Sequence, residues 1–248
     1  MAPSRTLKLT IAYDGTNYVG WQRQENGLSV QQLVEEALQP MCGGDVPVVM
    51  GASRTDAGVH ASGQVASVRV GFEHPATAVH RALNVRLPAD VRVLAVEDAA
   101  PGFHARFDAR GKSYRYRIAT ARVPLPFDRW FLWHMPQPCD VEAMRAASRC
   151  LVGRHDFSSF QARGATVLDG WRTLERVEVE HLGSEIHVHV DGDGFLRHMV
   201  RIVVGTLVDI GVGRRGVESM AATLAACDRQ AAGRTAPAHG LTLLEIRY

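Results

Sequence analysis

The feature that most constrains the fold is a series of short strand-like and helix-like segments. The order of these segments repeats loosely in the second half of the chain. In the strand-like segments apolar and polar residues alternate, which is typical of strands with one buried face. In the helix-like segments apolar residues recur every three or four positions. Neighbouring strand-like segments are often joined by short turns. This pattern predicts an α+β chain with mainly antiparallel sheets.

The stretch 99–102, Ala-Ala-Pro-Gly, separates the two runs and is the expected domain boundary. We therefore expect an N-terminal half over residues 1–102 and a C-terminal half over residues 103–248. In the first half we expect strands at 7–13, 46–52, 64–70 and 91–96, a helix that follows Ser29 and stops at Gly43, and a short helix near 75–84. In the second half we expect strands at 112–118, 174–181, 185–190 and 241–248, and helices at 140–151, 194–211 and 217–227.

Composition is that of an ordinary soluble globular protein. Of the 248 residues, 46% are hydrophobic and 22% are charged, which allows one large domain or two smaller ones. The chain contains neither an apolar run long enough for a membrane span nor the apolar core of a signal peptide near Met1. Its four cysteines are far apart and form no Cys-x-x-Cys pair, which indicates reduced, mostly buried thiols in a cytoplasmic protein.

The basic residues are almost all arginines, since Lys8 and Lys112 are the only lysines. A net charge of +2 does not by itself indicate nucleic acid binding. Between Arg106 and Arg122, however, six basic residues accompany a single acid, Asp108. Arginine binds phosphates with a planar fork and stacks on bases. This local cluster therefore predicts a basic patch for an anionic partner, although a GC-rich genome would also favour arginine.

The segment most suggestive of chemistry spans residues 51–64, where Arg54 and Asp56 lie among glycines and other small residues between two predicted strands. A carboxylate beside a cation stays ionised at neutral pH. An ionised aspartate suits a nucleophile or a general base, not a general acid. The alternative is an aspartate that only accepts hydrogen bonds from the backbone of a turn. The neighbouring arginine and the permissive glycines favour a catalytic Asp56.

Residues 112–118 predict a strand with Tyr114 and Tyr116 on one face and Arg115 and Arg117 on the other. The tyrosines could simply belong to the core. An aromatic ring beside a basic rim is also how proteins hold single-stranded RNA bases.

Residues 191–201 indicate a helix entry capped by Asp193, with Arg197 and Arg201 four positions apart on one face. A calcium loop fits poorly, because the further ligands and the distal glutamate are missing. An arginine on a largely buried helix needs an acidic partner, and Asp56 is the partner we expect.

Histidines offer a weaker signal. His187 and His189 share a predicted strand face and could bind a metal together with His181 or His198. No zinc-binding spacing is present, so we expect a solvated or hydrogen-bonded strand face and no metal site.

Taken together, the motifs of this chain resemble those of the tRNA pseudouridine synthase A family, enzymes that isomerise uridines at positions 38, 39 and 40 in the anticodon stem-loop of tRNA. The resemblance spans nearly the whole chain. One departure is Ser53, where many members have Gly. The five ordered motifs that carry the resemblance are Tyr13-Asp-Gly-Thr-Asn-Tyr-Val-Gly-Trp-Gln22, Arg54-Thr-Asp-Ala-Gly-Val-His60, Tyr114-Arg-Tyr116, His198-Met-Val-Arg201 and Thr235-Ala-Pro-Ala-His-Gly-Leu241.

The resemblance implies roles for individual residues. Asp56 matches the catalytic aspartate, and Arg54 matches an arginine that helps to flip the target base. Tyr114 matches a tyrosine that stacks on the target uracil, Arg201 matches the basic residue that pairs with the aspartate, and Leu241 matches an apolar residue at the floor of the pocket. The resemblance further implies two similar α/β halves with the cleft between them, a homodimer, tRNA as partner, and neither metal nor organic cofactor.

Two other functions fit parts of the sequence. A tRNA-binding protein or chaperone without turnover would explain the basic cluster and the tyrosines, but gives Asp56 no role. A nucleoside or glycoside hydrolase usually needs two carboxylates at a defined separation, and the loop offers one.

Overall fold

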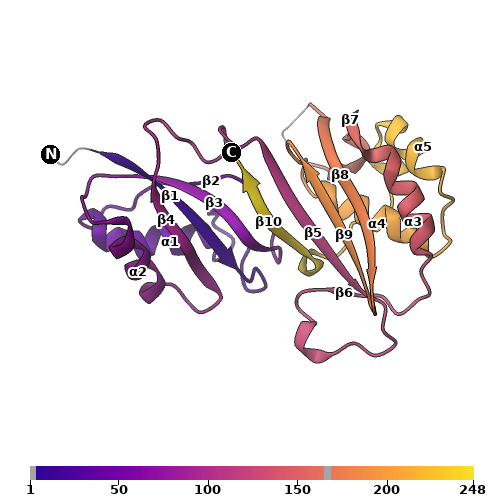
Figure 1. The fold of residues 1–248 in the computed structure, drawn as a ribbon, viewed down its shortest axis with the longest axis horizontal. Helices are drawn as coiled ribbons and strands as arrows, with labels where there is room; N and C mark the ends of the chain where they lie inside the picture. The colour runs from indigo at the N-terminus through magenta and orange to yellow at the C-terminus, as the bar shows by residue number, and fades with distance from the viewer. Residues whose placement is uncertain (1–3, 165–168) are drawn as a thin grey trace. The chain divides into compact units, whose positions relative to one another are not determined.

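The computed structural model describes residues 4–164 and 169–248. The chain forms two compact units, one made of Met1–Arg110 with Leu243–Tyr248 and one made of Gly111–Thr242 (Figure 1). The division after Arg110 differs from the predicted boundary at residues 99–102. The C-terminal strand, which we expected in the second half, belongs mostly to the first unit.

The first unit is built on a sheet in the order β4-β1-β3-β10, in which β1 pairs antiparallel with β3 and with β4, and β2 pairs antiparallel with β3. Alternate residues of β1 are buried, including Leu7, Leu9 and Ile11, as the alternating sequence predicted. The strands are β1 (Arg5–Tyr13), β2 (Val49–Gly51), β3 (His60–Val70), β4 (Val91–Asp98) and β10 (Leu241–Arg247).

Two helices accompany this sheet, α1 (Val30–Leu38) and α2 (Ala76–Arg86). The Ser29 side chain accepts a hydrogen bond from the backbone N–H of Gln32, which confirms it as the N-cap of α1. A 3-10 turn over Gln39–Cys42 follows, and Gly43 ends it in the left-handed region, with φ 71°. α2 packs against β4, and α1 contacts both α2 and β2.

The second unit has a sheet in the order β5-β9-β8-β7, antiparallel throughout, and the short β6 runs parallel to β5. Tyr114 and Tyr116 share one face of β5 and Arg115 and Arg117 the other, as predicted; the two tyrosines are buried and the two arginines are half-buried. The strands are β5 (Gly111–Ala119), β6 (Trp133–His134), β7 (Gly153–Asp156), β8 (Trp171–Leu182) and β9 (Glu185–Gly192).

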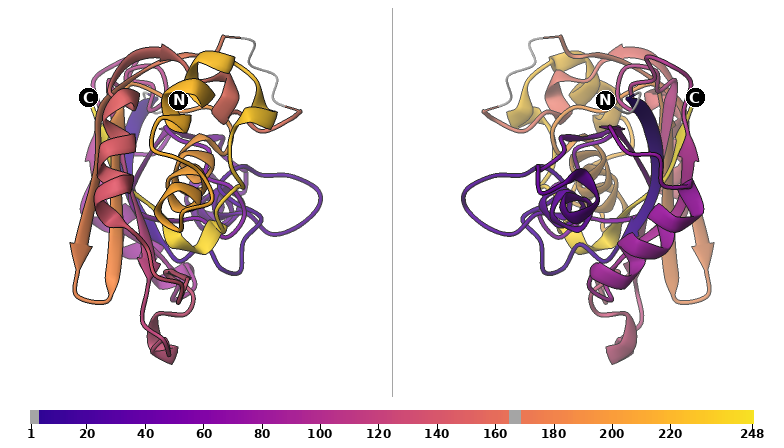
Figure 2. Two further views of the ribbon diagram at one scale, coloured as in Figure 1. Left: turned by 90° about the vertical axis from the view of Figure 1, so that its right-hand side faces the viewer. Right: turned by 90° about the vertical axis from the view of Figure 1, so that its left-hand side faces the viewer.

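The helices of the second unit are α3 (Val141–Ser148), α4 (Met199–Gly211) and α5 (Ser219–Ala226). α3 packs on α4 and β8, and α4 reaches β5 (Figure 2). Nearly every residue of α4 is buried, which explains its almost wholly apolar sequence. Asp140 caps α3 by accepting from the N–H of Ala143.

The start of α4 corrects one prediction. The helix begins at Met199, not at Gly194, and Asp193 does not cap it. The Asp193 carboxylate instead accepts a hydrogen bond from the N–H of Thr173, at 3.0 Å. His198 occupies the N-cap position with φ 60°, a conformation uncommon outside glycine.

These elements confirm the predicted α+β class, with a mixed, mainly antiparallel arrangement of strands flanked by helices. Among the described residues, no helix has the length and apolar character that a bilayer crossing requires.

Candidate active site

The loop between β2 and β3 presents Arg54 and Asp56 on either side of a buried threonine. Arg54 is exposed, Thr55 is buried and Asp56 is half-buried, which is the alternation expected of an extended segment. Asp56 forms an isolated antiparallel bridge with Gly20, so its backbone is already held in a strand-like geometry. The loop therefore directs the side chains of Arg54 and Asp56 away from the core. The buried side chain of Thr55 holds the loop in place.

Gln64 of β3 supports the start of the same loop. Its side-chain N–H donates to the carbonyl of Ser53 at 2.6 Å, and its side-chain oxygen accepts from the N–H of Ser53 at 3.2 Å. Ser53 is buried, which shows that the serine is accommodated where many family members carry glycine. The paired contacts fix the residue immediately before Arg54.

Tyr114 lies in the second unit, where β5 places its ring in the core. The side chain is buried, and its ring meets that of Phe195 edge-on with centroids 5.0 Å apart. Phe195 belongs to the segment just before α4. The aromatic pair joins β5 to the approach of the helix that carries Arg201.

Arg201 lies in the first turn of α4 and is tied to the segment that precedes β10. Its Nε donates to the carbonyl of Ala236 at 2.9 Å, and the N–H of Ala236 donates back to the Arg201 carbonyl at 3.0 Å. Leu241, at the start of β10, is buried. The motifs around Arg201 and Leu241, far apart in sequence, therefore meet in one unit.

Tyr116 adds a contact that the sequence did not predict. Its hydroxyl donates to the carbonyl of Pro237 at 2.7 Å, and its ring fills the space in which a side chain at Gly240 would clash. Burial raises the pKa of Tyr116 well above its usual range, and the charge of Arg201 opposes that shift in part. Tyr116 therefore remains a neutral hydrogen-bond donor.

The histidines of β9 lie beside a glutamate. Ligand atoms of Glu180, His187 and His189 all lie within 4.8 Å of one another, whereas the metal site considered as an alternative from the sequence had His181 or His198 as its third member. His187 Nε2 lies 2.8 Å from a carboxylate oxygen of Glu185, and His189 Nε2 lies 3.4 Å from Glu180. These contacts with carboxylates account for the positions of both rings. That the protein needs no metal stays a prediction.

The basic cluster predicted between Arg106 and Arg122 is divided by the fold. Arg106 and Arg110 are exposed in the first unit, whereas Arg117 in the second unit is paired with Glu185 at 2.8 Å. Arg117 is thus committed to an internal ion pair. That the other basic residues of the cluster bind an anionic partner stays a prediction.

The chain's relatives fix its family. A sequence model of the family described as tRNA pseudouridine synthase matches residues 9–108 and 147–248. The chain belongs to the tRNA pseudouridine synthase family. The matched segments contain Arg54, Asp56, Arg201 and Leu241, while Tyr114 lies between them.

Individual members of the family are similar over nearly their whole length. The tRNA pseudouridine synthase A of Syntrophotalea carbinolica is 49% identical over 98% of this chain and 96% of its own. Those of Moorella thermoacetica and Pelobacter propionicus are 48% and 46% identical over 98% of this chain and 99% and 100% of their own. Membership of this family makes the protein an isomerase and disfavours an RNA-binding protein without turnover.

Proposed function

We propose that the protein isomerises uridine to pseudouridine at positions 38, 39 and 40 in the anticodon stem-loop of tRNA. Asp56 acts as the nucleophile or base on a flipped uridine. The observation that carries the proposal is the Arg54–Asp56 loop, which presents one carboxylate and one guanidinium on either side of the buried Thr55 in a chain of this family.

We assign four other residues to binding the substrate or to keeping Asp56 ionised. The exposed Arg54 helps to flip the uridine and hold it out of the stack. Tyr114 stacks on the uracil, and Leu241 lines the floor of the pocket. Arg201 pairs with Asp56 and favours its ionised form. These assignments rest on the motifs of the family at the same positions of this chain.

The reaction leaves the elemental composition of the substrate unchanged. The N1–C1′ bond breaks, the uracil turns, C5 joins C1′, and the hydrogen of C5 leaves as N1 regains a proton. Asp56 could attack C1′, attack C6 of the ring, or remove the 2′ hydrogen to give a glycal, and each route uses an ionised carboxylate. Because the reaction is an isomerisation, it consumes no redox carrier, and from the family resemblance we propose neither metal nor organic cofactor.

The substrate must leave the helix before the chemistry. Flipping a base costs a few kcal/mol. Stacking on an aromatic ring returns about 1–3 kcal/mol per base, so Tyr114 would offset part of the cost. Tyr114 is also the group that we propose to accept the C5 proton.

We further propose a cytoplasmic homodimer. Support for self-association comes from the segment 122–130 between β5 and β6, where Val123, Leu125 and Phe127 are 78%, 67% and 83% exposed. Several exposed apolar side chains on one short segment are a feature of protein interfaces. The four cysteines are all free, which suits a reducing compartment. We expected them to be mostly buried, but Cys227 is exposed and the other three are half-buried.

Mapping pseudouridine in tRNA from cells with and without the protein tests this function. We expect pseudouridine at positions 38, 39 and 40 only where the protein is present. The purified protein should convert the same uridines in an unmodified transcript and release no uracil. Equal modification of those positions in its absence would contradict the proposal, free uracil would indicate a hydrolase, and binding without conversion would indicate a chaperone.

A further inference from the structure

The motif Tyr13–Gln22 has no role in the chemistry proposed above, yet it runs along the Arg54–His60 loop. The N–H of Trp21 donates to the carbonyl of Thr55 at 3.1 Å, and the N–H of Gly58 donates to the carbonyl of Tyr18 at 3.4 Å. Together with the bridge between Gly20 and Asp56, these bonds pair the backbone of the motif with the loop.

Two glycines of the motif permit this close approach. A Cβ on Gly20 would lie 2.4 Å from the carbonyl oxygen of Thr55, and one on Gly15 would lie 2.0 Å from that of Val59. Gly20 also has φ +110°, which side-chain-bearing residues rarely adopt. Only glycine lets the motif pack this closely on the loop.

A side-chain hydrogen bond joins Thr55 to Tyr13, the last residue of β1. The hydroxyls of Tyr13 and Thr55 lie 2.8 Å apart, and both side chains are buried. Thr55 separates Arg54 from Asp56 in sequence. Because side chains alternate along an extended segment, holding Thr55 inward fixes the direction in which both neighbours point.

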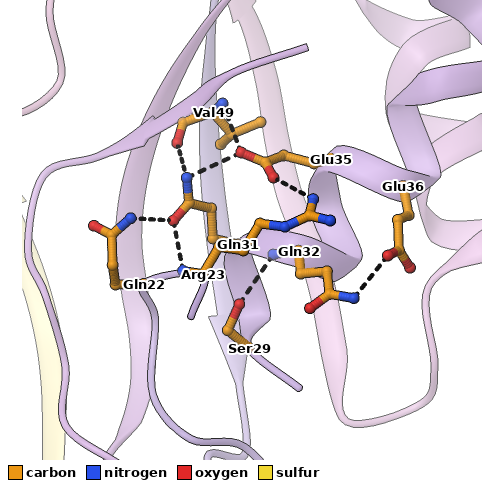
Figure 3. A network of polar contacts seen from close by, with 8 residues as sticks. All are labelled: Gln22, Arg23, Ser29, Gln31, Gln32, Glu35, Glu36 and Val49. Atoms are coloured by element: carbon orange, nitrogen blue, oxygen red, sulfur yellow. Dashed lines mark hydrogen bonds and ion pairs between the residues drawn. The ribbon is translucent and has the colours of Figure 1, made fainter. Parts of the chain in front are cut away.

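The motif is itself held firmly at its far end (Figure 3). The Gln31 side-chain oxygen of α1 accepts from the Gln22 side chain at 2.8 Å and from the N–H of Arg23 at 2.9 Å. The buried Glu35 accepts from Arg23 at 3.1 Å and from the N–H of Val49 in β2 at 3.2 Å. The support therefore runs from β1 and α1 to the loop within one unit.

We propose that Tyr13 is a positioning residue for the catalytic loop, acting through Thr55 on Arg54 and Asp56; this rests on the proposed role of Asp56. Removing the Tyr13 hydroxyl leaves the tRNA-binding surface intact but loosens the loop. Misplacement of a catalytic group by about 1 Å can lower a rate by about 100-fold.

Tyr18 offers a matched control for this proposal. It lies in the same motif, is also buried, and its hydroxyl donates to Asp90 at 2.5 Å, away from the loop. Tyr13→Phe and Tyr18→Phe each remove one hydroxyl and the hydrogen bond described for it. A purely structural contribution would therefore appear in both variants.

The test is the single-turnover rate of pseudouridine formation with enzyme in saturating excess over a tRNA transcript. We expect Tyr13→Phe to be slower by about 10-fold or more at unchanged tRNA affinity, with Tyr18→Phe at the wild-type rate. Thr55→Val should lower the rate as Tyr13→Phe does, and the double variant should be no slower than either single variant.

A wild-type rate for Tyr13→Phe, or equal losses for Tyr13→Phe and Tyr18→Phe, would overturn the positioning role. Additive losses in the double variant would also overturn it. Asp56→Asn, measured in the same assay, separates this inference from the proposed function. If Asp56→Asn still converts uridine, the assignment of Asp56 has failed, whatever Tyr13→Phe shows.

Discussion

Arg117 illustrates how a single residue departs from its sequence-based interpretation. It lies in a basic run that predicts an anionic partner, but its Nε and Nη2 donate to the two carboxylate oxygens of Glu185, at 2.9 and 2.8 Å. The bidentate pair, with help from His187, lowers the pKa of Glu185 from 4.5 to about 2. The partner lies on β9, beside Arg117 in space and far from it in sequence.

This ion pair predicts a pH-dependent stability. Because the folded-state pKa of Glu185 is depressed, its contribution is complete above about pH 4.5 and disappears as the pH falls through about 2. In urea unfolding at pH 7, Glu185→Gln should be less stable than the wild type, and the difference should shrink between pH 5 and pH 3. Glu142→Gln, which removes an exposed pair with Arg145, should show no such trend. A difference for Glu185→Gln that is constant with pH would contradict this account.

Among the elements, those with a strong local pattern were predicted well. β1, α1, β5 and β9 lie where alternation or helical spacing placed them, and Ser29 caps α1 as expected. β2 is shorter than predicted because Val46 and Val48 are exposed and Pro47 has no N–H to donate.

Elements that depend on distant partners could not be predicted. β7 has no alternating pattern and exists because it pairs with β8. The start of α4 is displaced because Asp193 bonds to Thr173 and Phe195 packs on Tyr114. The contact between Tyr13 and Thr55 also joins residues that are distant in sequence, so sequence analysis could not predict it. Both residues nevertheless belong to motifs that were identified in the sequence.

At the scale of the whole molecule, the chain closes its first unit with its last residues. The Tyr248 hydroxyl donates to the carbonyl of Ala105 at 2.8 Å, and the N–H of Arg110 donates to the carbonyl of Arg247 at 2.8 Å. The predicted boundary at 99–102 is a tight turn, in which the N–H of Phe103 bonds to the carbonyl of Ala100, at 3.0 Å. A Pro-Gly signal marks a turn and cannot tell whether a domain ends there.

The proposed homodimer makes a prediction at this scale. Val123 and Val85 are 78% and 79% exposed, but only Val123 lies in the segment 122–130. Light scattering after size exclusion should show a dimer for the wild type and for Val85→Asp, and a shift towards monomer for Val123→Asp, because a charge at an apolar interface costs several kcal/mol. A monomeric wild type, or a Val123→Asp variant as dimeric as the wild type, would argue against this interface.

The most direct test of the central claim is tritium release from tRNA labelled at C5 of uridine, because each conversion frees one C5 hydrogen. The wild-type protein should release tritium, and Asp56→Asn should release none while still binding the same tRNA. Removing the single carboxylate of the loop takes away the group that every proposed route requires. Tritium release by Asp56→Asn at a rate near that of the wild type would contradict the account.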